Sequence, residues 1–182
     1  MKQRTDEKNV DALGIGGEYI AYCRRRLLRE YLPKVRRCVE ELTEEDVWWR
    51  AHDTDNSVGN LILHLCGNIR QWIVSGIGGT PDVRNRPQEF SERGPIPKAV
   101  LLKKFEDVLA EADRSLERFD LSKLLEVRHI QLYDVTCLDA ISHAVEHVSL
   151  HVGQIVYITK LRKGIDLDLF HLTKFEDRFS KR

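Results

Sequence analysis

Three of the seven histidines lie within nine residues, at positions 143, 147 and 151. A spacing of four residues places side chains on the same side of an α-helix. Imidazole nitrogens are common ligands of zinc and other transition metals, and the H-x-x-x-H spacing allows one helix to provide two ligands to one ion. We therefore interpret His147 and His151 as a metal-binding pair.

The helix that carries this pair is predicted over residues 136–164. Its residues are apolar around most of the circumference, which is typical of a largely buried helix, and Leu150, Ile158 and Leu161 fall within the apolar arc. His147 and His151 point almost opposite the polar gap that contains Glu146, whereas His143 lies closer to its edge. Buried imidazoles must satisfy their ring nitrogens, either with a shared metal ion or with carboxylates and carbonyls.

A second helix, predicted over residues 58–75, carries His64 at the flank of a regular apolar stripe. His64 is therefore either a third ligand reaching from a neighbouring helix or a boundary histidine. Three neutral imidazoles would leave coordination positions for water or substrate, as in catalytic rather than structural sites. Zinc, nickel and iron all suit imidazole ligands. His143 is a candidate for contact with the ligands rather than with the ion.

Four long helical patterns organise the chain, and they predict an all-α four-helix bundle with a long crossover between helices 2 and 3. Pro33 should kink the first helix or move its start. Thr136 and Gly164 are predicted to cap the last one. We expect a flexible N-terminal arm over residues 1–17 and one domain over residues 18–182. The predicted helices cover 18–42, 58–75, 98–119 and 136–163, with a Gly- and Pro-rich connection at 76–97 and a short extended segment near 124–133.

Composition narrows the class of protein. The 29 basic residues balance the 29 acidic ones, so the basic excess expected of a nucleic-acid-binding protein is missing. The four cysteines are scattered without a C-x-x-C pair, which favours reduced thiols in the cytoplasm. The charged N-terminal segment does not resemble a signal peptide, and no apolar run is long enough for a membrane span.

Three stretches resemble the DinB-like / YfiT-like superfamily of metal-dependent enzymes: NLILHLCGNIRQWI around His64, DVRNRPQEF in the crossover, and EHVSLHVGQI around His147 and His151. The resemblance covers residues 19–170. It implies a four-helix bundle in which one histidine of the second helix joins two of the last helix at one divalent ion, nickel or zinc. Matched by position, these ligands are His64, His147 and His151.

The resemblance also implies a function. Its characterised members include transferases and isomerases that use a low-molecular-weight thiol, so we expect a metal-dependent transferase or hydrolase acting on a small molecule. Homodimers are common in the superfamily, and its name implies no DNA binding. In the crossover, Arg84, Arg86 and Glu89 are either pocket residues or a salt-bridged connection. A non-catalytic metal-binding sensor or scaffold, and a purely structural bundle, are the competing hypotheses.

Overall fold

The computed structural model describes residues 2–94 and 96–169, with side chains from residue 13 onward. This part of the chain is mostly helical, as predicted, and it also contains a small antiparallel sheet. The helices are α1 (Lys2–Arg25), η1 (Arg26–Tyr31), α2 (Leu32–Glu41), α3 (Glu44–Trp48), α4 (Val58–Ile69), η2 (Arg70–Ser75), α5 (Arg86–Ser91), α6 (Lys98–Glu117), η3 (Leu121–Lys123) and α7 (Cys137–Lys163), and the strands are β1 (Val127–Ile130) and β2 (Tyr133–Thr136).

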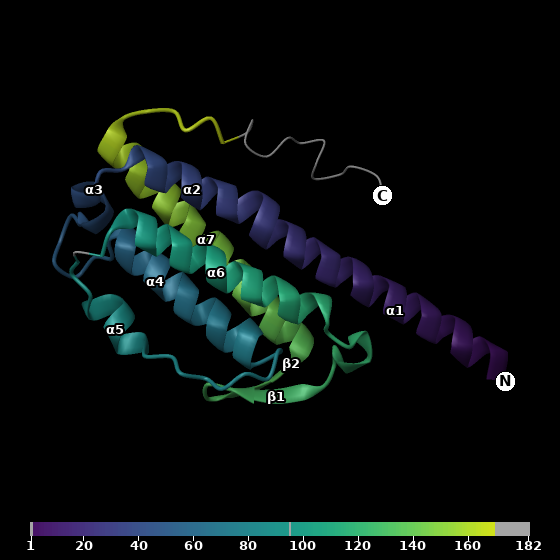
Figure 1. Ribbon diagram of the computed structural model, residues 1–182. Coiled ribbons are helices and arrows are strands. Elements are labelled where there is room, and N and C mark those ends of the chain that lie inside the picture. Colours follow the sequence, from purple (N-terminus) through teal and green to yellow (C-terminus); the bar gives the residue numbers. More distant parts are fainter. Residues whose placement is uncertain (1, 95, 170–182) are drawn as a thin grey trace.

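The long helices lie side by side, with α4 packed against both α6 and α7, and α2 packed against α7 (Figure 1). The short helix α5 lies beside α4, in the connection that leads to α6. The hairpin β1–β2 joins α6 to α7 at one end of the helices, with Val127 paired to Thr136. The contact between α4 and α7 brings together the two helices that carry the candidate ligands.

Local signals explain where α4 begins and where α7 begins and ends. Ser57 accepts a hydrogen bond from the backbone N–H of Asn60, whose side chain bonds back to the N–H of Ser57, so α4 begins with a complete capping box. Thr136 caps α7 by accepting a hydrogen bond from the backbone N–H of Asp139. Gly164 ends α7 with φ of 64°, a left-handed conformation that favours glycine.

Pro33 lies directly after a π-helical turn. The N–H of Leu32 bonds to the carbonyl of Leu27, five residues earlier, at the end of η1. A proline ring collides with the carbonyl four residues before it in a regular α-helix, and a wider turn at this point relieves that conflict. The predicted irregularity near Pro33 is therefore present as a change of helix type.

Several expectations need correction. The sequence predicts a loose arm over residues 1–17, whereas α1 begins at Lys2. The 76–97 connection contains α5. The predicted extended segment near 124–133 is confirmed as strand β1, which pairs with β2 in a hairpin. Val100 is 43% exposed although its periodicity predicts an inward position, whereas the next residue, Leu101, is fully buried. Leu150 and Leu161 on α7 are also exposed.

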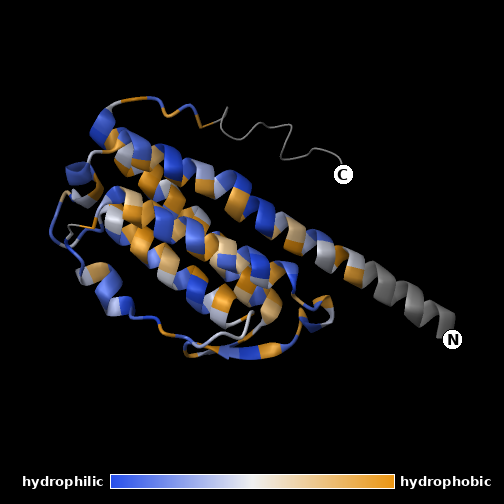
Figure 2. Cartoon of the chain, in the orientation of Figure 1, coloured by the Kyte–Doolittle hydropathy of each residue, from blue (hydrophilic) through white to orange (hydrophobic). Residues whose placement is uncertain are grey.

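The core lies between the long helices, where their apolar faces meet (Figure 2). Phe105 of α6, Leu65 of α4 and Val148 of α7 are fully buried there. Leu167, after the end of α7, is also buried, and Ile165 and Leu169 pack against the core, so the segment after Gly164 docks on the helices as far as residue 169. None of the described helices is both long enough and apolar enough to cross a lipid bilayer.

Candidate metal centre

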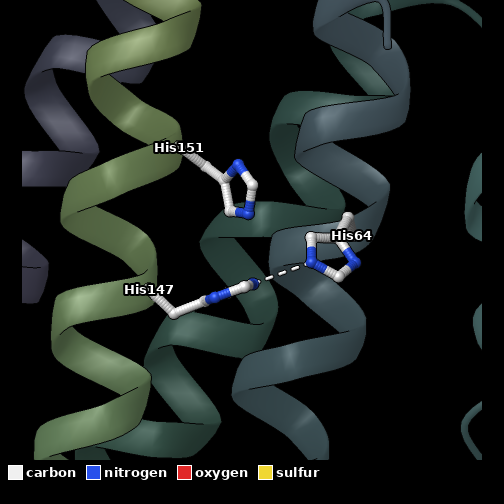
Figure 3. Close-up of side chains that lie close together, drawn as sticks. All are labelled: His64, His147 and His151. Atoms are coloured by element: carbon white, nitrogen blue, oxygen red, sulfur yellow. Dashed lines mark hydrogen bonds between the residues drawn. The ribbon is translucent and has the colours of Figure 1, made fainter. Parts of the chain in front are cut away.

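The imidazole rings of His64, His147 and His151 converge between α4 and α7 (Figure 3). Nε2 of His64 and Nε2 of His147 are 2.7 Å apart. One nitrogen from each of the three rings lies within 4.8 Å of the others. The structure therefore brings together the three residues that the sequence proposed as ligands.

The ring nitrogen of His64 that faces away from His147 is held by a carboxylate. Nδ1 of His64 lies 2.9 Å from Oε2 of Glu89, and both side chains are buried. A carboxylate only accepts hydrogen bonds, so Nδ1 carries the hydrogen and donates it. Consequently Nε2 of His64, which faces His147, has a free lone pair and can act as a metal ligand.

A buried arginine holds Glu89 in its charged form. Nε and Nη2 of Arg84 donate to the two carboxylate oxygens at 2.7 and 2.9 Å, and the side chain of Arg84 is only 3% exposed. Burial acts to raise the pKa of Glu89, but the hydrogen bonds from Arg84 and His64 outweigh it and lower the pKa below its ordinary value. Hydrogen bonds thus link Arg84 to Glu89 and Glu89 to His64, and they form a network that reaches from the crossover to the triad.

The Arg84–Glu89 ion pair of this network packs closely against α4. A Cβ atom on Gly67 would lie 1.9 Å from Oε1 of Glu89 and 2.9 Å from Nε of Arg84, so only glycine leaves room for the ion pair. On its other side Arg84 donates to Oε1 of Gln71, whose Nε2 donates to Asp82. The DVRNRPQEF stretch therefore wraps onto α4 and η2 through buried polar contacts.

The outer nitrogen of His151 also has an acceptor. Nδ1 of His151 lies 2.6 Å from Oε1 of Gln154, one turn further along α7, so His151 can present Nε2 to the centre as well. Burial lowers the pKa of His147 to about 3, and the proximity of His151 and His64 acts in the same direction. Burial likewise lowers the pKa of His151. His147 and His151 are therefore neutral at pH 7, as metal ligands must be.

This donor set fits a divalent metal ion. Ligand nitrogens about 2.0–2.1 Å from a tetrahedral ion lie about 3.3 Å from one another. That separation falls between the 2.7 Å of the closest pair and the 4.8 Å limit of the whole group, so small ring rotations suffice. The described residues include one such group of three His, Cys, Asp or Glu side chains.

Two polar groups on the same helical segment as His64 are buried without a hydrogen-bond partner. They are Oδ1 of Asn68 and Nε1 of Trp72, which follow His64 at successive intervals of four. The Trp72 ring lies 4.2 Å from the ring of His143, which stacks 5.5 Å from His147. An acceptor and a donor thus remain available on the same side of the α4–η2 segment as His64.

The other candidates from the sequence have different positions. His143 is exposed and contacts Trp72 and His147, so it lies beside the triad as predicted. Arg86 is exposed and packs over the ring of Phe90, which in turn contacts His64, so it reaches the triad only through that ring. Of the three crossover residues, Arg84 and Glu89 enter the site directly and Arg86 does not.

The sequence did not single out Gln154 or Gln71. Gln154 is a polar residue three positions after His151, a spacing that allows contact within one helix. Gln71 lies seven positions after His64, on the same side of its helix. Both signals are local and common in helices, so they identify a functional residue only when the ligand histidines are already known.

Comparison with known proteins gives a family assignment. No curated protein was found to match the sequence. A family described as "Protein of unknown function (DUF1572)" matches residues 14–174, a span that contains all three histidines and the crossover. It is a DinB/YfiT-like family, which confirms the resemblance seen in the sequence. The chain belongs to the DUF1572 family of proteins of unknown function.

Proposed function

We propose that the protein is a divalent-metal-dependent enzyme of the transferase or hydrolase type, built on a four-helix bundle. The observation that carries the proposal is the convergence of His64, His147 and His151 from two helices, with Nδ1 of His64 held by the buried Glu89–Arg84 ion pair. A histidine that served only to fill space would not need a charged pair buried behind it.

Each residue has a distinct part in this proposal. His64, His147 and His151 would hold the ion through three neutral nitrogens, and nickel or zinc suits such a set. When bound, the ion would act as a Lewis acid that makes a thiol or a water molecule more acidic. Glu89 and Gln154 fix the rings by accepting from Nδ1 of His64 and of His151.

The substrate side of the proposal follows the family resemblance. We infer a small-molecule substrate and a low-molecular-weight thiol as the second reactant, in a cytoplasmic homodimer. The unpartnered Asn68 Oδ1 and Trp72 Nε1 support a polar ligand near the triad, because buried polar atoms are normally satisfied. Neither atom distinguishes a thiol transfer from a hydrolysis.

The direct test is elemental analysis of protein purified without a nickel column. We expect about one divalent ion per chain in the wild type, and loss of the ion in His147→Ala. The matched control is His129→Ala, which removes an exposed histidine that pairs with Asp134 away from the triad. A folded wild type that takes up neither zinc nor nickel would rule out the proposal.

A second experiment separates an enzyme from a non-catalytic sensor or scaffold. The metal-loaded protein would be mixed with a panel of low-molecular-weight thiols and electrophilic acceptors, and both thiol consumption and hydrolysis of the acceptors would be followed. Turnover that requires His64 supports the enzyme. Stoichiometric metal binding without turnover of any pair would instead favour the sensor or scaffold.

A further inference from the structure

A cavity of about 620 Å³ lies beside the triad, between α4, α7 and the segment that follows α3. Its walls are largely apolar, and three of the side chains there are unusually exposed for their type: Leu150 at 60%, Tyr157 at 69% and Leu161 at 58%. Gly153, on the same side of α7, has no atom within 4 Å of its Cβ position, so the helix surface is open there.

The cavity is adjacent to the candidate ligands on both helices. Leu61, in its wall, precedes His64 by three residues on α4. Gln154, also in its wall, accepts the hydrogen bond from Nδ1 of His151. The end of the cavity at Leu61 and Gln154 therefore lies about one helical turn from the triad.

One cation in the wall, Arg50, has no carboxylate within ion-pair distance among the described residues, although Asp55 also lines the cavity. Among the residues that the structure describes, Arg50 forms no ion pair, and its Nη1 is buried without a hydrogen-bond partner. Nη2 of Arg50 only reaches Oδ1 of Asn60, at 3.4 Å. Burial lowers the pKa of Arg50, and the charge of Arg93 adds to this effect while Asp53 opposes it. Guanidinium groups in such surroundings are normally paired with carboxylates or phosphates.

We propose that this cavity binds the substrate of the proposed enzyme, and that the substrate is an apolar molecule carrying one anionic group that pairs with Arg50. The inference rests on the proposed function for the identity of the reaction, but the cavity and its charge are independent of the metal. The apolar part would cover Leu150 and Tyr157, whose exposure it explains. Either a carboxylate or a phosphate could be this anionic group, because both pair with a guanidinium.

The test uses three ligands with the same apolar part: 4-phenylbutanoate, 4-phenylbutyl phosphate and the neutral 4-phenylbutanamide. Their affinities would be measured by calorimetry on the wild type and on His147→Ala, in which an anion cannot bind through a metal ion. We expect at least one anion to bind roughly tenfold or more tightly than the amide in both proteins, as is usual for a hydrogen bond to a charged group. The preferred anion identifies the group.

Variants locate the binding. Arg50→Gln should reduce the preference for the anion to about threefold or less, while Arg29→Gln, which removes an exposed arginine of η1, should retain it. Gly153→Leu should abolish binding of all three ligands by filling the open surface.

Equal affinities for anion and amide in the wild type, or an unchanged preference in Arg50→Gln, would overturn the proposal. So would the absence of saturable binding, or a dimer that dissociates in Gly153→Leu, because a second copy would then cover this face. If the wild type preferred the anion but bound no metal, the anion-binding cavity would be supported and the proposed metal-dependent function would be ruled out.

Discussion

Glu89→Gln is the substitution that tests how the triad is positioned. It keeps the size of the side chain and removes the negative charge that accepts hydrogen bonds from His64 at 2.9 Å and from Arg84 at 2.7 and 2.9 Å. A glutamine has one oxygen and one NH2 group, so it cannot accept from both partners as the carboxylate does. Either His64 loses its fixed ring orientation or Arg84 faces another donor.

Two effects of known size follow. Loss of a hydrogen-bond partner behind a ligand histidine typically weakens metal binding about 10- to 100-fold, or about 1.4–2.7 kcal/mol. Separately, Arg84 would remain buried without its counter-charge, and a broken buried ion pair costs about 3–5 kcal/mol of folding stability. The metal affinity must therefore be measured on protein whose folding has been verified.

The assay is competition for zinc with a chromophoric chelator, at a temperature where circular dichroism shows the variant to be folded. Glu146→Gln is the control, because Glu146 is exposed and precedes His147 in the chain, so the same charge is removed near the site without touching a ligand. We expect the control to bind zinc within about twofold of the wild type. Equal affinities for wild type and Glu89→Gln, or an equal loss in both variants, would refute the positioning role of Glu89.

Two further predictions concern the packing of Gly67 against Glu89 and a separate ion pair between Asp46 and Arg162. Gly67→Ala should weaken zinc binding as Glu89→Gln does, because the new methyl group would displace the Glu89 carboxylate, while Gly153→Ala should leave it unchanged, as titration with the same chelator would show. The ion pair with Arg162 and the hydrogen bonds from Thr43 outweigh the effect of burial and lower the pKa of Asp46 to about 2. Because the folded pKa lies below the ordinary 3.8, this stabilisation is present above pH 4 and is lost as the pH falls towards 2. Asp46→Asn should therefore be about 1 kcal/mol less stable than the wild type at pH 7, which corresponds to a melting temperature roughly 2–4 °C lower. This difference in melting temperature should shrink by pH 2, and a difference that persists at pH 2 would contradict this account.

The sequence predicts correctly what depends on local periodicity and helix ends. The apolar spacing on α4, α6 and α7 reports which direction each side chain takes around its own helix, and the caps at Thr136 and Gly164 report where α7 begins and ends. These signals act over one or two turns, so the chain alone is sufficient to reveal them. They also place His147 and His151 on one side of α7.

Longer-range features needed the tertiary structure. The approach of His64 to His147 depends on how α4 packs against α7, and the residue that holds His64, Glu89, lies 25 positions later in the short helix α5. The open face of α7 at Leu150 and Tyr157 has the same origin, since periodicity states that a side chain is apolar but not whether another helix covers it. Local sequence patterns determine which side of its own helix each side chain occupies. Only the packing of distant segments decides which side chains come into contact and which remain open to a ligand.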